Sequence, residues 1–169
     1  HIALQLCKGD INGVLDESII KKITTSANTV QKIVTDQNIT YGINTGFGIL
    51  ASTLISKENT KLLQYKILQS HSTGVDKPID TIIAKLMLIT KVHALAQGYS
   101  GIQLATLQRI IWHINHNVIP VVPEKGSVGA SGDLAPLAHL FLPLIGLGEV
   151  MYKGEKIITE KLFTITGLK

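Results

Sequence analysis

Apolar residues recur every three or four positions over long stretches of the chain, which is the spacing of amphipathic helices. The clearest case is residues 17–36, where Asp16 stands at the capping position and the apolar side chains share one face. Three further stretches show this spacing after a capping residue: 57–69 (Ser56), 81–97 (Asp80) and 101–117 (Ser100). The chain is therefore predicted to be mainly α.

Two shorter patterns interrupt the helices. Pro120 and Pro123 favour an extended backbone, because each proline disfavours helix at the residue before it. Residues 149–158 alternate in polarity around Lys153-Gly154, which predicts a small β-hairpin.

The segment 134–147 is strongly apolar and contains two prolines and His139. Its length of about 14 residues is short of the roughly 20 that a membrane-spanning helix needs. We therefore predict a helix over residues 134–145 that is buried on nearly all sides, and no partnership with a membrane.

Composition narrows the class of protein. The 169 residues are 45% hydrophobic and 17% charged, which is typical of a globular domain with its own core. The net charge is +4, but the lysines are scattered and Arg109 is the only arginine, so a nucleic-acid partner is not expected. Cys7 is the only cysteine, which excludes an intrachain disulfide and favours a reducing compartment such as the cytoplasm.

The tripeptide Ala130-Ser131-Gly132 stands between a glycine-rich stretch and an apolar helix. If the amide nitrogen of Gly132 attacks the carbonyl carbon of Ala130, whose oxygen leaves as water, and Ser131 loses its hydroxyl as a second water, the product is 4-methylideneimidazol-5-one (MIO). Glycine suits the attacking position because it tolerates backbone angles that other residues avoid. MIO is an electron-poor alkene, a strong electrophile of a kind that no ordinary side chain provides.

The same residues allow plainer interpretations. Ser131 or Asp133 could cap a helix that begins near Leu134. Glycines before a helix can also hold a phosphate, but the Gly-Lys-Ser/Thr ending of a phosphate-binding loop is missing.

A second motif, Tyr41-Gly42-Ile43-Asn44-Thr45-Gly46-Phe47-Gly48, predicts a mobile glycine-rich loop that carries a phenol. Together with the segment 126–137 it resembles the MIO-dependent ammonia-lyases and aminomutases, and among these the histidases. The resemblance implies the ammonia-lyase (fumarase/aspartase-like) helical fold. It also implies that Tyr41 is catalytic, and that Ala130, Ser131 and Gly132 are the MIO precursor, with Ser131 catalytic through it.

The pair Ser70-His71 lies at a predicted helix end, where an imidazole can bind the terminal carbonyls of its own helix or a substrate. By resemblance it is the Ser-His pair with which histidases bind the imidazole of the substrate. The implied reaction is elimination of ammonia from L-histidine to give trans-urocanate. A tyrosine or phenylalanine ammonia-lyase or an aminomutase is the alternative, and Gln103 stands where relatives often have arginine.

The resemblance further implies that residues 1–169 are the N-terminal, MIO-bearing part of a larger lyase whose C-terminal helical core lies beyond them. The full-length enzyme is then a homotetramer with sites built from several subunits. We therefore expect this chain alone to be inactive, and a helical module that keeps the motif only as structure is the remaining alternative.

His113 and His116 are three residues apart, a spacing that can chelate a metal. No carboxylate or third histidine stands at a supporting position, so we expect no metal site. His113, beside Trp112, is predicted to lie on the surface of its helix.

Overall fold

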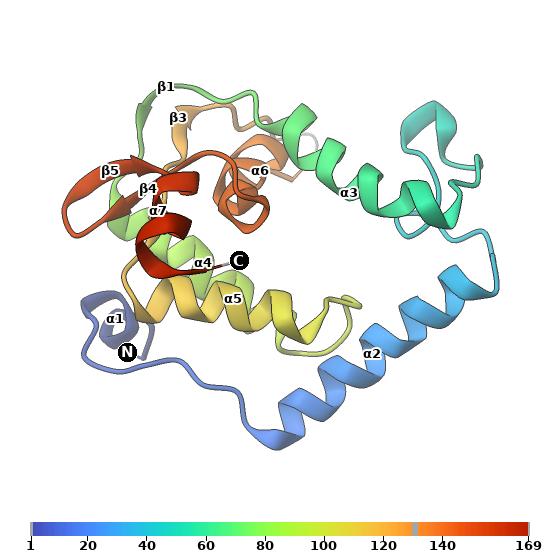
Figure 1. The fold of residues 1–169 in the computed structure, drawn as a ribbon, viewed down its shortest axis with the longest axis horizontal. Helices are drawn as coiled ribbons and strands as arrows, with labels where there is room; N and C mark the ends of the chain where they lie inside the picture. The colour runs from blue at the N-terminus through green and yellow to red at the C-terminus, as the bar shows by residue number, and fades with distance from the viewer. Residues whose placement is uncertain (1, 130–131, 169) are drawn as a thin grey trace.

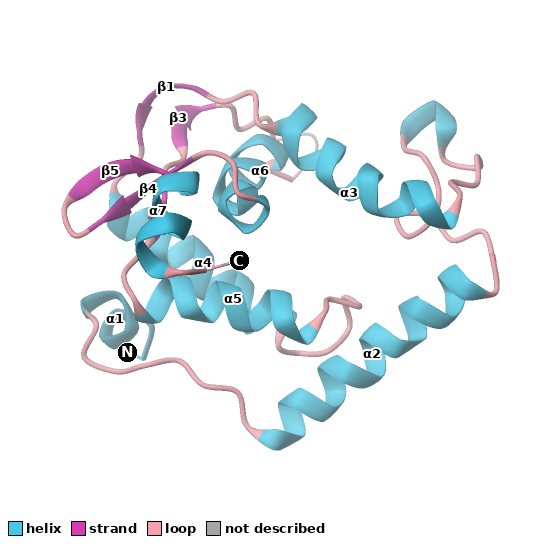
Figure 2. Ribbon diagram, viewed as in Figure 1, coloured by secondary structure: helices cyan, strands magenta, loops and turns pink. Residues whose placement is uncertain are grey.

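The computed structural model describes residues 2–129 and 132–168. Helices form most of it, and two small antiparallel sheets lie at one end (Figure 1) (Figure 2). In chain order the elements are α1 (Ile2–Lys8), α2 (Glu17–Thr35), the 3-10 turn η1 (Gly48–Leu50), α3 (Lys57–His71), β1 (Val75–Pro78), α4 (Thr81–Leu95), α5 (Leu104–Asn115), β2 (Ile119–Pro120), β3 (Pro123–Lys125), α6 (Leu134–Phe141), the 3-10 turn η2 (Leu142–Ile145), β4 (Glu149–Tyr152), β5 (Glu155–Ile158) and α7 (Thr159–Thr166). The mainly α class and the helical fold are confirmed.

The capping predictions hold at two helices. The Asp16 carboxylate accepts the Ile19 N–H at 2.9 Å and so satisfies a free donor at the start of α2. Asp80 accepts the Ile82 N–H at 2.8 Å at the start of α4. Ser56 precedes α3 as predicted, but its side chain makes no capping hydrogen bond.

The predicted start of α5 at Ser100 is wrong. The helix begins at Leu104, because Gly101 has φ +71°, which is outside the helical region. A Cβ at Gly101 would lie 2.2 Å from Val30 Cγ2. The N–H of Gly101 donates to Ser26 Oγ at 3.0 Å. The turn before α5 is thus shaped by its packing against α2.

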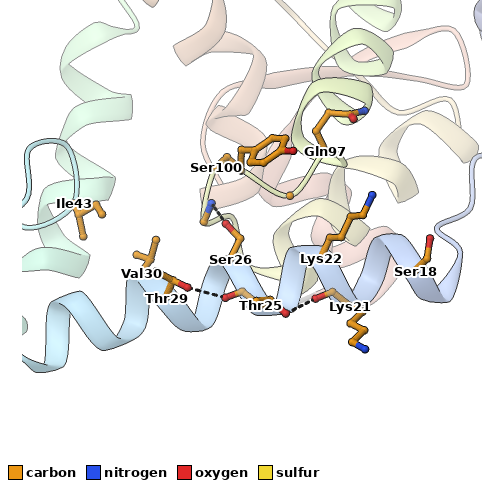
Figure 3. A pocket seen from close by; sticks show the side chains of 13 residues that line it. Ser18, Lys21, Lys22, Thr25, Ser26, Thr29, Val30, Ile43, Gln97 and Ser100 are labelled. Atoms are coloured by element: carbon orange, nitrogen blue, oxygen red, sulfur yellow. Dashed lines mark hydrogen bonds between the residues drawn. The ribbon is translucent and has the colours of Figure 1, made fainter.

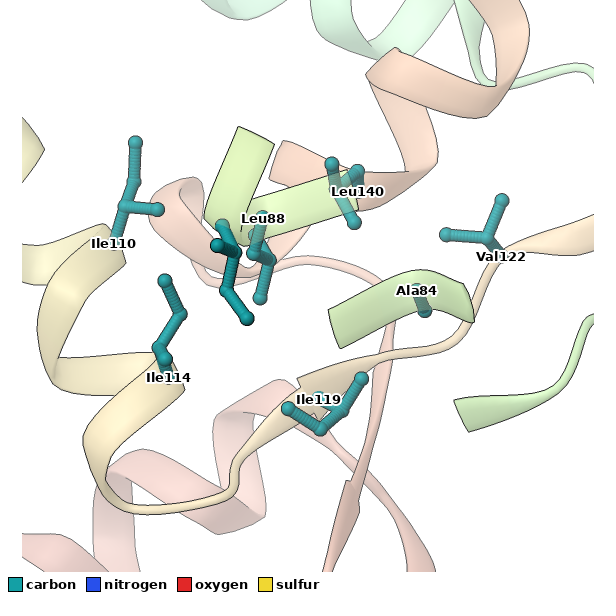
Figure 4. Close-up of a cluster of buried hydrophobic side chains, with 8 residues drawn as sticks. Ala84, Leu88, Ile110, Ile114, Ile119, Val122 and Leu140 are labelled. Carbon is teal, nitrogen blue, oxygen red and sulfur yellow. The ribbon is translucent and has the colours of Figure 1, made fainter. Parts of the chain in front are cut away.

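The main core lies between α4 and α5 and is closed by residues that follow them (Figure 4). Its buried side chains are Ala84, Leu88, Ile89, Ile110, Ile114, Ile119, Val122 and Leu140. A smaller cluster of Val118, Val150, Ile157 and Leu162 joins the three-stranded sheet to α7. Burial of these aliphatic side chains supplies the main stabilisation of the fold.

The hairpin of β4 and β5 is confirmed. Lys153 (φ +50°) and Gly154 (φ +84°) are both left-handed, as a tight two-residue hairpin turn requires. The sequence did not predict that β2 would extend this sheet, nor that β1 would pair with β3. The β1–β3 pair matters most here, because it lies directly beside the candidate site.

The apolar stretch over residues 134–145 is helical, but it changes from α to 3-10 geometry at Leu142, where Pro143 cannot continue the α-helical hydrogen bonds. Ala135, Ala138 and Leu140 are buried, whereas Leu134 is 47% exposed. The prediction of burial on nearly all sides is therefore wrong at the first turn of α6. Among the described helices, none combines the length and the apolar character needed to cross a bilayer.

His113 does not lie on the surface as predicted. Its ring is 2% exposed, with Nδ1 3.1 Å from the Val118 carbonyl oxygen, and Nε2 has no hydrogen-bond partner. His116 is exposed and stacks on Trp112. Burial lowers the pKa of His113 to about 4, against a smaller opposing effect of the Val118 carbonyl.

Candidate active site

The loop of residues 126–133, here called the Ala-Ser-Gly loop, runs from β3 to α6. Ala130 and Ser131, on which the predicted MIO precursor depends, lie outside the described residues. Gly132 has φ +72° and Asp133 has φ +61°, so two successive left-handed residues end the loop. The Ser127 hydroxyl donates to the Asp133 carboxylate and ties the two ends of the loop together.

Asp133 precedes α6, but its side chain makes no capping hydrogen bond, so the plainer interpretation of Asp133 as a cap is not supported. The first N–H groups of α6 are the positive end of that helix and lie next to the loop. A Cβ at Gly132 would meet no atom within 4 Å, so glycine is favoured there by its backbone conformation and not by crowding. The left-handed backbone of Gly132 is of the kind that glycine tolerates at the attacking position of the proposed cyclisation.

His71 is the last residue of α3 and is half-buried. Its Nδ1 lies 2.8 Å from the Ile67 carbonyl oxygen and 3.1 Å from Ser70 Oγ. A carbonyl only accepts hydrogen bonds, so Nδ1 carries the proton, and in the neutral ring Nε2 then has a lone pair. The histidine thus binds its own helix through one nitrogen and keeps the other as an acceptor.

The turn of residues 72–74, here called the His71 turn, is held against the Ala-Ser-Gly loop. Val75 pairs with Lys125 at the start of the β1–β3 ladder, which places residues 74 and 126 next to each other. The Gly74 N–H also donates to His139 Nε2 on α6, at 3.0 Å. The structure therefore brings His71 and the loop of Gly132 into one region.

The loop that carries Tyr41 is fixed by Asn44, which is 2% exposed. Its amide donates to the Asn38 carbonyl at 2.9 Å and accepts the Thr40 N–H at 2.9 Å. Tyr41 itself is 65% exposed and meets Phe47 edge-on at 5.9 Å. The phenol is thus presented outward from a pinned turn.

Tyr41 does not join the other two candidates within one chain. Its loop precedes the first residue of α3, whereas His71 ends that helix (Figure 1). The 15 residues of α3 make it about 22 Å long, and the loop of residues 41–48 lies near the end of the helix where Lys57 stands (Figure 1).

A cavity of about 800 Å³ lies between α2 and residues 97–101, with Ile43 at its edge (Figure 3). None of Tyr41, His71 and Gly132 lines it. The cavity is wide open to solvent and its lining includes many hydroxyl groups. It is therefore separate from the region where the candidate chemistry gathers.

Sequence reasoning missed two residues that shape this region. Asn44 lies within the recognised motif, but only the glycines there suggested a role in the backbone. His139 was a lone histidine on an apolar helix, and its partner Gly74 is 65 positions away in sequence. A polar residue within an apolar helix was the available signal.

The helical arrangement defines a domain of the ammonia-lyase and aminomutase type. The family model described as aromatic amino acid lyase matches residues 3–169, and the chain belongs to that family. Over 98% of its own length, the chain is 44% identical to the histidine ammonia-lyase of Shewanella sediminis. The chain spans only 32% of the length of that relative.

Two solved structures agree with this assignment. The histidine ammonia-lyase of Trypanosoma cruzi is 32% identical, with a TM-score of 0.84, over 98% of this chain and 33% of that one. The tyrosine aminomutase of Streptomyces globisporus is 27% identical, with a TM-score of 0.90, over 99% of this chain and 31% of that one.

Proposed function

We propose that residues 1–169 are the N-terminal, Ala-Ser-Gly-bearing part of a histidine ammonia-lyase, which eliminates ammonia from L-histidine and releases trans-urocanate. The identity of 44% to an enzyme of that name, over nearly the whole chain, carries this proposal. The remaining two thirds would supply the C-terminal helical core. We place the enzyme in the cytoplasm.

The reaction needs help at two bonds, because an amine leaves poorly and a β-proton is weakly acidic. The MIO group built from Ala130, Ser131 and Gly132 would supply an electron-poor alkene that makes the substrate amine a better leaving group. The N–H groups at the start of α6 would stabilise negative charge that develops beside the loop.

His71 would bind the side chain of the substrate. With Nδ1–H held by the Ile67 carbonyl, Nε2 is free to accept a hydrogen bond from a ring N–H. A phenyl ring has no such donor and would leave the acceptor unpaired, which disfavours phenylalanine. A phenol O–H does offer one, so the related tyrosine-specific lyase or aminomutase is the second candidate.

Tyr41 would transfer the proton taken from the β-carbon or orient the substrate amine. Because its loop precedes α3 whereas His71 ends that helix, we propose that the Tyr41 of a neighbouring subunit completes each site. This accords with a homotetramer as the active form. A single copy of this chain is then expected to show no turnover.

The test is Ser131→Ala in the full-length protein. We expect nearly all urocanate formation to be lost, together with the mass deficit of two water molecules that MIO formation leaves. Ser100→Ala, an exposed serine in another turn, serves as the control and should retain both. Retained turnover in Ser131→Ala would refute the mechanism, and wild-type preference for tyrosine over histidine would select the second candidate.

A further inference from the structure

His139 makes a hydrogen bond that the proposed chemistry does not use. It lies in the second turn of α6, and its Nε2 accepts the Gly74 N–H at 3.0 Å. Because Nε2 accepts, the proton of the neutral ring is on Nδ1. Burial lowers the pKa of His139, which keeps this acceptor form in place near neutral pH.

The bond joins the two parts of the candidate site by a short path. On one side, Gly74 is three residues after His71, and the Thr73 N–H donates to the His71 carbonyl at 2.9 Å. On the other side, His139 belongs to the helix that begins directly after the Ala-Ser-Gly loop. A shift of the His71 turn relative to that loop therefore requires this bond to stretch or break.

The backbone of the His71 turn packs closely against the Ala-Ser-Gly loop and α6. A Cβ at Gly74 would lie 3.1 Å from His139 Nε2 and 3.2 Å from the Lys125 carbonyl oxygen. A Cβ at Gly126, where φ is +151°, would lie 2.9 Å from Gly74 Cα. Two glycines thus allow the turn and the loop to touch, and His139 is the side chain that hydrogen-bonds across the contact.

We infer that His139 is a positioning residue of the proposed lyase site, which sets the place of His71 relative to the MIO-bearing loop by accepting the N–H of Gly74. The inference rests on the proposed function, because it concerns how the ring-binding residue is held beside the electrophile. Loss of the bond should affect binding of the substrate ring more than formation of the electrophile.

The experiment compares His139→Leu with His139→Gln in the full-length protein. Leucine removes the acceptor, whereas the glutamine side-chain oxygen reaches about as far as Nε2 and can accept the same N–H. For His139→Leu we expect an unchanged mass deficit, a KM for histidine raised roughly three- to tenfold, as one neutral hydrogen bond warrants, and a smaller change in kcat. His139→Gln should restore KM to within about twofold of wild type.

A second readout separates positioning from general loosening. Inhibition by imidazolepropionate should weaken in His139→Leu, while inhibition by phenylpropionate, which offers no ring N–H to His71, should change little. His93→Leu, an exposed histidine on α4, is the matched control and should behave as wild type. If His139→Leu does not fold, His139→Asn replaces it, because its amide is too short to reach Gly74.

An unchanged KM in the non-bonding variant would overturn the inference. So would equal weakening of both inhibitors, or a loss of the mass deficit that glutamine does not restore, since either would indicate a merely structural role. Wild-type protein that turns over no aromatic amino acid would instead refute the proposed function, and this inference with it.

Discussion

Acidification should destabilise this chain through His113, whose ring is buried at the end of α5. The unfolded-state pKa is 6.5 and the folded-state pKa is about 4, because burial disfavours the charged ring and the nearby Arg109 and His116 add to that effect. Between these values the unfolded state binds a proton that the folded state does not. Stability is therefore complete above about pH 6.5 and falls as the pH drops towards about 4.

The size of the loss follows from the two pKa values. Their difference of 2.5, from 6.5 to about 4, corresponds to roughly 3 kcal/mol at about 1.4 kcal/mol per pH unit. At about pH 5 the unfolded state has gained most of this advantage, and about 2 kcal/mol of stability should be lost. This is a large part of the 5–15 kcal/mol that holds a typical domain together.

The test is urea unfolding of the chain, followed by circular dichroism, between about pH 7.5 and pH 4.5. His113→Asn removes the titrating group but leaves an amide N–H that can donate to the Val118 carbonyl, as Nδ1 does now. We expect it to be less stable than wild type at neutral pH but to lose less stability on acidification. His116→Asn, an exposed histidine bonded to the Trp112 carbonyl, is the control and should keep the steep pH dependence. Equal pH dependence in wild type and His113→Asn would refute the reasoning.

Two other results are expected. Gly101→Ala should lower the free energy of unfolding in urea by roughly 2–3 kcal/mol, because residue 101 is left-handed and its new Cβ would overlap Val30. Gly9→Ala is the control: residue 9 is also left-handed (φ +81°) but has no neighbour within 4 Å, so the loss should be only about 1 kcal/mol. Equal losses would show that the contact with α2 is unimportant. Full-length tetramers assembled from equal amounts of Tyr41→Phe and Ser131→Ala subunits should regain about a quarter of wild-type activity. Each site needs an intact Tyr41 from one subunit and an intact Ser131 from another, and each is present with a probability of about one half. Absence of any regain would show that both groups come from the same subunit.

The sequence predicted those elements whose causes are local. The helix α2 has an apolar stripe and an aspartate that caps it, and the hairpin has a Lys-Gly turn in which both residues are left-handed. The start of α5 was misplaced because the conformation of Gly101 depends on Val30 and Ser26, which are far away in sequence. The strand β1 was missed because its four residues are exposed and include a proline.

The candidate site also combines features that the sequence could predict with contacts that it could not. The Ala-Ser-Gly motif could be proposed from residue type and order, and Tyr41 from the resemblance of its motif to the family; the roles of both stay predictions. The bond from Gly74 to His139 could not, because it exists only when α6 packs beside the end of α3. The inward turn of His113 escaped prediction for a similar reason, since the Val118 carbonyl that its ring meets lies beyond the end of the helix.

The geometry of α3 ties the proposed chemistry to assembly. One end of this helix follows the outward-facing phenol of Tyr41, and the other carries His71 against the Ala-Ser-Gly loop. A rigid helix about 22 Å long cannot bring its own two ends together. We propose that the Tyr41 that acts on the substrate bound by His71 comes from another copy of the chain. The mixed-tetramer experiment therefore tests whether the Tyr41 and the Ala-Ser-Gly loop of one site come from different copies of the chain.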